Sequence, residues 1–171
     1  MRPQIFVQSL GSFLAGNIDG EWLDAAQDAA DLWSEVEQIL AAHEDEEYII
    51  LDINDFGGID IDGYEDIGKV SQIALALEEH GKPFAVFYQH FQRETVDETL
   101  TDYEDLYFGS YTSEAEFVEE YLDNFTCSEV MNAPLMYGKV RDFIDISRVK
   151  NVLDSEYFIE EQNGEVYVFV S

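Results

Sequence analysis

Residues 3–24 read PQIFVQSLGSFLAGNIDGEWLD, and this stretch sets the start of the fold. Its β-branched and apolar run over residues 5–10 predicts a strand that ends at Gly11. The residues that follow, through Gly16, Gly20 and Trp22, place turn chemistry between apolar anchors. They predict a structured loop.

Outward from this stretch, the N-terminal part alternates helix and strand. Apolar residues recur at helical spacing over residues 28–43 while the acids point elsewhere, which predicts an amphipathic helix with an acidic face. Residues 48–53 predict another strand, and residues 54–63 an acidic loop rich in glycine. Strand, helix and strand together indicate an α+β unit.

The remainder is mainly helical until a closing hairpin. Helical stripes mark residues 67–77, residues 84–91 and, more briefly, residues 103–107, and a breaker at residues 80–83 separates the first two. Ser113 and Glu116 have capping-box spacing for a helix to residue 125, and Asp145 is expected to cap a helix that includes Val149, Val152 and Leu153. Asn163 and Gly164 predict a type I′ turn between strands at residues 157–161 and 165–170.

These elements predict an α+β protein, organised as an elongated chain of three small subdomains. We expect an α+β domain over residues 1–62, a mainly helical domain over residues 63–108, and an α+β domain with the hairpin over residues 109–171. The 38 acidic and eight basic residues give a net charge of −30, the charge of roughly 50 Å of DNA duplex at about 1.7 Å per charge. A single ball of this length, roughly 40 Å across, would not set out that charge in a line.

The charge also limits the partners. Nucleic-acid binding requires clustered cations and an anionic membrane repels carboxylates, so neither is an expected partner. Basic grooves are favoured, reached by electrostatic steering that weakens with salt. Residues 1–66 carry a net charge of −16, residues 67–130 carry −11, and residues 131–171 carry −3. This asymmetry indicates a dedicated acidic surface rather than acid spread evenly for solubility, and the less charged end is available for self-association.

The single cysteine, Cys127, has no internal disulfide partner, and the sequence shows neither a leader pattern nor an apolar run near twenty residues. These features predict a cytoplasmic protein.

Several ordered blocks carry a family resemblance. Residues 3–10, Ala15, Gly16 and residues 20–24 form the most specific block, and the later ones are residues 50–52, 55–57, 64–67, 79–81, 103–107 with Gly109, Tyr111 and Ser113, then 143–145 and 164–169. In this order they resemble the ArdA antirestriction family. Ile146 stands where that family usually has an aromatic residue, and residues 133–139 match less well.

The resemblance implies an elongated three-domain protein that pairs into a curved homodimer, imitates bent B-form DNA and blocks type I restriction-modification enzymes. Such proteins are carried by mobile elements and protect incoming DNA. The resemblance implies no catalytic residue, metal or cofactor. We expect the DNA-mimicking surface to use carboxylates of the first two domains, including Asp19, Glu21, Asp24, Asp28, Asp31, Glu35, Asp52, Asp55, Asp60, Asp62, Glu65 and Asp66.

The same residues bear on other structural and functional interpretations. The spacing of Trp22, Trp33 and the Phe/Tyr stripes predicts core positions. The acids of residues 52–62 do not fit the EF-hand template, although a weak divalent-cation site stays open, and so does a scaffolding role for the acidic chain. His43, His80 and His90 have no nucleophile or metal-ligand partner at a known spacing, which argues against an enzyme.

Overall fold

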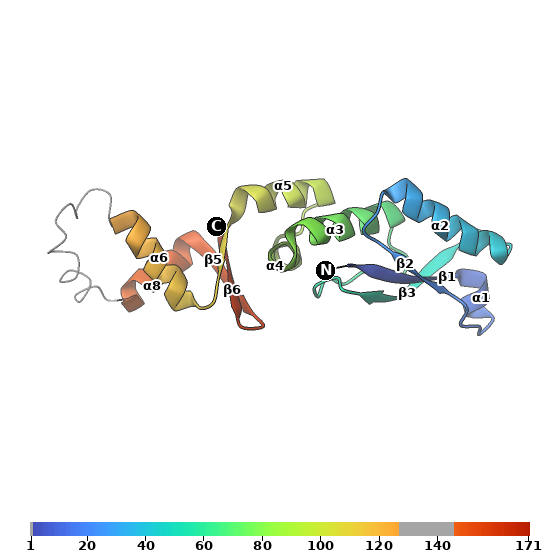
Figure 1. Cartoon of the computed structure of the whole chain (residues 1–171), viewed down its shortest axis with the longest axis horizontal. Helices are drawn as coiled ribbons and strands as arrows, with labels where there is room; N and C mark the ends of the chain where they lie inside the picture. Colours follow the sequence, from blue (N-terminus) through green and yellow to red (C-terminus); the bar gives the residue numbers. More distant parts are fainter. Residues whose placement is uncertain (1, 127–145) are drawn as a thin grey trace. The chain divides into compact units, whose positions relative to one another are not determined.

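A computed structural model describes residues 2–126 and 146–171 of the chain. Helices and two three-stranded antiparallel sheets confirm the predicted α+β class (Figure 1). The chain divides into an N-terminal unit, Met1–Glu104, and a C-terminal unit, Asp105–Ser171. The expected division into three domains at residues 62 and 108 stays a prediction.

The sheet of the N-terminal unit is built around its first strand. Strands β1 (Gln4–Ser9), β2 (Glu21–Asp24) and β3 (Tyr48–Asn54) lie in the order β2-β1-β3. Both neighbours run antiparallel to β1, and Ile5 pairs with Leu23 on one side and Ile53 on the other. Ile5, Val7 and Leu23 are buried, so this face of the sheet forms part of the core.

The loop predicted between residues 11 and 22 is wrong in part. Residues Leu10–Leu14 form helix α1, where the Ser9 hydroxyl accepts a hydrogen bond from Ser12 N at 3.1 Å, and Glu21–Asp24 form β2. No pattern in the sequence marks either of these two short elements. Because a four-residue edge strand gains its hydrogen bonds from β1, the pairing partner decides its conformation.

Helix α2 (Ala29–Ala42) confirms the predicted amphipathic helix. The Asp28 carboxylate caps it by accepting a hydrogen bond from Ala30 N at 2.9 Å. Its buried stripe of Leu32, Val36, Ile39 and Leu40 packs against β1 and β2 (Figure 1). The acids on its other side stay in contact with water.

The prediction that Trp22 and Trp33 belong to the core is wrong. Trp22 is 46% exposed and Trp33 is 39% exposed. Trp22 lies on the opposite face of β2 from Leu23 and packs on Phe6, with ring centroids 5.5 Å apart. Trp33 contacts Tyr48 edge-on at 5.9 Å, and its indole N–H donates to Glu37 at 3.0 Å. Spacing places a side chain on a face but does not show whether another element covers it.

Three further helices meet around an aromatic cluster. Helices α3 (Ile67–His80) and α4 (Lys82–Phe91) are separated at Gly81, whose φ of 67° ends α3, as the breaker predicted. Helix α5 (Val96–Leu106) begins at a capping box in which Thr95 and Glu98 exchange hydrogen bonds. The Tyr103 ring lies 5.5 Å from Phe84 and 5.7 Å from Phe87, so it joins α5 to α4.

The C-terminal unit has the strand order β4-β6-β5, with β4 (Tyr107–Tyr111), β5 (Tyr157–Gln162) and β6 (Glu165–Val170). Helices α6 (Glu114–Thr126) and α8 (Ile146–Glu156) supply Phe117, Val118 and Leu153 to a core shared with Val166 and Val168. The predicted hairpin is confirmed, because Asn163 and Gly164 have φ of 56° and 79°.

Two details of this unit differ from the sequence prediction. Tyr107 begins a strand rather than ending a helical stripe, because β4 pairs with β6. Ser113 accepts from Glu116 N at 3.2 Å, as expected of a capping box, but the Glu116 carboxylate accepts from Thr112 rather than from Ser113. Asp145 and Cys127 lie outside the described residues.

Gly20 permits the close approach of β1 and the start of β2. A Cβ atom there would lie 2.5 Å from the Val7 carbonyl oxygen and 2.9 Å from two atoms of the Phe6 ring. The backbone atom has little freedom to move, so a side chain at this position forces the two strands apart.

We therefore expect Gly20→Ala to lower the free energy of unfolding of the N-terminal unit by about 2–3 kcal/mol. Urea unfolding followed by tryptophan fluorescence measures this, because Trp22 and Trp33 both belong to that unit. Gly16→Ala is the control: its φ is 85° but an added Cβ meets nothing within 4 Å, so only about 1 kcal/mol of backbone strain is expected. Equal stability of Gly20→Ala and the unaltered chain would contradict the close approach.

Candidate functional site

The twelve carboxylates expected to form the acidic surface all belong to the N-terminal unit, and none of them is buried. Asp24, Glu35 and Glu65 are half-buried and the other nine are exposed. This unit contains 24 acidic and four basic residues, a net charge of −20. Among these bases, Arg2 is ion-paired with Asp24, Lys69 with Glu65 and Arg93 with Asp102. Most of its carboxylates therefore have no compensating cation of their own.

One group of the predicted carboxylates is brought together beside α2. Asp19, Glu21 and Glu35 line an open hollow together with Leu23, Gln38, Ile39, Ala42 and His43. Glu21 comes from β2, Glu35 from α2 and Asp19 from the segment before β2. Residues far apart in sequence thus present their charges to one place.

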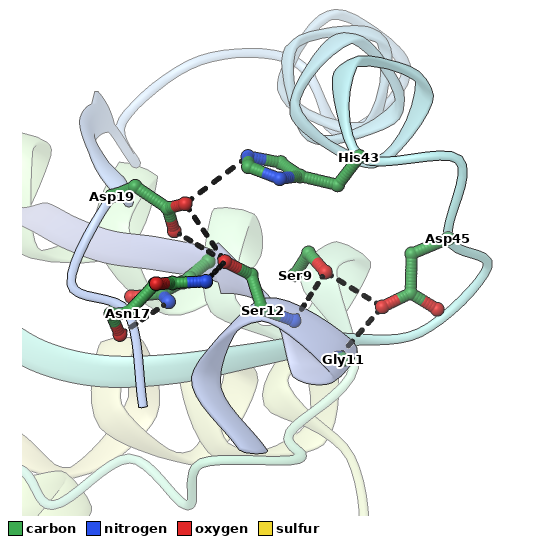
Figure 2. A network of polar contacts seen from close by, with 8 residues as sticks. Ser9, Gly11, Ser12, Asn17, Asp19, His43 and Asp45 are labelled. Carbon is green, nitrogen blue, oxygen red and sulfur yellow. Dashed lines mark hydrogen bonds and ion pairs between the residues drawn. The ribbon is translucent and has the colours of Figure 1, made fainter. Parts of the chain in front are cut away.

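Asp19 belongs to a network of polar contacts at the end of this hollow (Figure 2). Both of its carboxylate oxygens accept from the Ser12 hydroxyl, at 2.8 and 2.7 Å, and His43 Nε2 lies 3.8 Å away. Asn17 joins the network by donating to Ser12 at 3.3 Å and accepting from the buried Gln8 amide at 2.9 Å. These contacts fix the position of the Asp19 charge.

Sequence reasoning did not single out Asp45, which anchors the other half of the network (Figure 2). One Asp45 carboxylate oxygen accepts from the Ser9 hydroxyl at 2.6 Å and from Gly11 N at 2.7 Å. The other accepts from Glu46 N at 2.8 Å. These hydrogen bonds, that from Ser9 first, lower the pKa of Asp45 to about 2. Asp45 lies in an acidic run whose spacing shows no motif, so no local signal could have identified it.

Several predicted carboxylates also support the backbone. Asp28 and Asp66 cap α2 and α3, and Asp62 accepts from Tyr64 N at 2.8 Å. Glu65 accepts from Lys69 Nζ at 2.7 Å, and this hydrogen bond raises the pKa of Lys69. Such contacts hold the carboxylates in place without burying them.

Glu21, Asp31, Asp55 and Asp60 differ from these. Within the described part of the chain, their side chains make no hydrogen bond or ion pair, and all four are exposed. Their charges are therefore available to a partner without loss of an internal contact.

A metal site requires several ligand side chains close together. Within residues 2–126 and 146–171, no three His, Cys, Asp or Glu side chains are grouped as a metal ion would require. His80 packs on Tyr103 with ring centroids 5.1 Å apart, and His43 follows the end of α2. Of the helices that the structure describes, none is both long and apolar enough to cross a membrane.

The low pKa of Asp45 predicts a pH-dependent contribution to stability. Since the folded pKa of about 2 is below the ordinary value of 3.8, the ionised carboxylate favours the folded state. That contribution is complete above about pH 5 and is lost as the pH falls through about 2. We expect Asp45→Asn to be less stable than the unaltered chain at neutral pH, and the difference to disappear toward pH 2.

Urea unfolding as a function of pH tests this prediction, with Glu46→Gln as the control. Glu46 is the exposed neighbour, and its side chain makes no hydrogen bond among the described residues. A stability difference between Asp45→Asn and the unaltered chain that stays constant from neutral pH to about pH 2 would show that the low pKa is not present.

Comparison with known proteins agrees with the resemblance in the sequence. The family model described as "Antirestriction protein (ArdA)" matches residues 5–166, nearly the whole chain. A search of curated proteins finds no match. Because the family match covers both units, the chain belongs to the ArdA family of antirestriction proteins.

Proposed function

We propose that this protein inhibits a type I restriction-modification enzyme by occupying its DNA-binding groove, with carboxylates in the places of DNA phosphates. The observation that carries the proposal is the excess of exposed and uncompensated carboxylate on the N-terminal unit, 24 acids against four bases. A groove that binds DNA contacts mainly phosphates, through Arg and Lys side chains. Such a groove attracts a rigid array of anions at a similar density.

The hydrogen bonds that fix exposed carboxylates support DNA mimicry. Asp19, Asp28 and Asp66 are fixed by hydrogen bonds yet remain exposed. A fixed charge binds with a smaller entropic cost than one on a freely rotating side chain. These carboxylates are thus already in position before the inhibitor binds the groove.

We also propose a homodimer that acts in the cytoplasm, where a restriction enzyme would meet incoming DNA. Residues 131–171 carry a net charge of only −3, so two copies of this segment repel each other less than two copies of residues 1–66 or of residues 67–130 do. Two 19.6 kDa chains give a particle of about 39 kDa, which sedimentation equilibrium distinguishes from a single chain. A mass of one chain at micromolar concentration would contradict the dimer.

The inhibitory function is tested by competition. A type I methyltransferase core is loaded with labelled target duplex and titrated with the protein. We expect the duplex to be displaced, and the inhibition constant to weaken steeply as salt rises, because counterions screen the contacts between carboxylates and the basic groove. Duplex that stays bound at excess protein and modest salt would exclude this mode of action for that enzyme.

A charge-neutralised variant tests where the inhibitory surface lies. The combined change Glu21→Gln, Asp31→Asn, Asp55→Asn and Asp60→Asn removes four charges that make no described internal contact. We expect about tenfold weaker inhibition or more from the combination, and less than about threefold from each single change, because mimicry spreads the free energy over many groups.

The matched control removes four exposed charges from the C-terminal unit, through Glu120→Gln, Asp154→Asn, Glu156→Gln and Glu161→Gln. Equal weakening by both variants would mean that total charge, rather than the N-terminal surface, determines inhibition.

A further inference from the structure

Next to the carboxylates already described lies a hollow that the predicted surface does not include. Leu10, Glu46, Glu47, Tyr48 and Tyr64 line it, and we call it the Tyr64 hollow. A neighbouring hollow is lined by Trp33, Glu37, Leu40, Ala41, Asp45 and Glu46, so Glu46 borders both. Carboxylates and aromatic rings therefore stand together at this place on the N-terminal unit.

The aromatic rings here are unusually accessible. Tyr64 is 65% exposed and Trp33 is 39% exposed, while Tyr48 lies between them in sequence and contacts Trp33 edge-on. An exposed aromatic ring is a frequent anchor in protein interfaces, because it adds a large contact area at a small entropic cost. The exposed rings thus offer this region a kind of contact that its charge alone does not provide.

The frame around the hollow is held by hydrogen bonds. Asp45 accepts from Glu46 N at 2.8 Å and from Glu47 N at 3.4 Å, and Leu10 N donates to the Glu47 carbonyl at 2.8 Å. The Tyr48 hydroxyl donates to the Glu65 carbonyl at 2.8 Å, and burial raises the pKa of Tyr48. These hydrogen bonds hold the backbone at residues 10, 46 and 47 and the Tyr48 side chain in place.

The negative charge of the hollow favours the binding of a cation. Glu46 and Glu47 are exposed, and neither side chain makes an ion pair among the described residues. A cationic side chain in the hollow has both carboxylates and aromatic rings among the lining residues. A nucleic-acid base would find rings but no cations for its phosphate.

We propose that the Tyr64 hollow is a binding site for an arginine side chain of a basic protein partner. The guanidinium group lies on the Tyr64 ring and pairs with Glu46 and Glu47. Arginine fits better than lysine, because its planar, weakly hydrated cation stacks on aromatic rings and forms forked hydrogen bonds with carboxylates. The choice of partner rests on the proposed function, since the basic groove of a restriction enzyme would supply the arginine.

The test is an NMR titration of the full chain with the blocked tripeptide acetyl-Gly-Arg-Gly-amide. We expect saturable shifts that are largest at the amides of residues 46–48 and 64 and at the Trp33 indole N–H. The lysine counterpart is expected to bind about threefold more weakly, since it lacks the planar group. Shifts that spread over all carboxylates without saturating would overturn the proposal, and so would equal binding of the two peptides.

Variants separate the ring from the charge. Tyr64→Ala is expected to weaken binding of the arginine peptide about threefold, and Tyr64→Phe to restore most of it, because stacking needs the ring and not the hydroxyl. The combined change Glu46→Gln and Glu47→Gln is expected to weaken binding about fivefold. Glu78→Gln with Glu79→Gln removes two exposed charges from α3 as the control. If the control weakens binding as much as the Glu46 and Glu47 pair, the site is not there.

These measurements contain no enzyme, so their outcome does not depend on whether the proposed function is correct. Local arginine binding without displacement of duplex would keep the site and reject the inhibitory mechanism. Displacement of duplex without local arginine binding would reject the site and keep the mechanism.

Discussion

Repulsion among carboxylates is the constraint under which this chain folds. With 38 acids and eight bases, the folded state brings like charges closer than the unfolded chain does. The structure limits this cost by leaving the predicted carboxylates in contact with water and by directing backbone N–H groups at several carboxylates of the N-terminal unit. Asp28 and Asp66 cap helices, and Asp45 accepts three backbone N–H groups and a hydroxyl. Each such contact stabilises a charge without neutralising it, so the net charge of the surface is preserved.

The apolar residues offset this repulsion by forming a buried core in each unit. In the N-terminal unit, α2 covers one face of the first sheet, and an aromatic cluster around Phe84 and Tyr103 holds the later helices together. In the C-terminal unit, Phe117 and Leu153 pack on the inner residues of β6. Burial of these side chains opposes the electrostatic cost, because the apolar contribution does not depend on the charges outside.

The same arrangement leaves two kinds of carboxylate on the surface. Some acids, such as Asp19, are fixed by internal contacts, whereas Glu21 and Asp60 make none among the described residues. Under the proposed function, such an array would distribute its interaction with a basic groove over many groups. The Tyr64 hollow adds a different element, because exposed rings beside Glu46 and Glu47 discriminate between cations that charge alone treats as equal.

The sequence by itself determined the α+β class, the amphipathic helix α2, the stop at Gly81 and the turn at Asn163 and Gly164, because each rests on local periodicity or local backbone preference. It also determined the charge and the blocks that mark the family, and it identified carboxylates that prove to be exposed or half-buried. Only the tertiary structure decided that Glu21–Asp24 and Tyr107–Tyr111 are strands, that Trp22 and Trp33 face water, and that Asp45 holds together segments 36 residues apart. The physical reason is that strand pairing, burial and shared hydrogen bonds depend on partners distant in the chain, which no local pattern encodes.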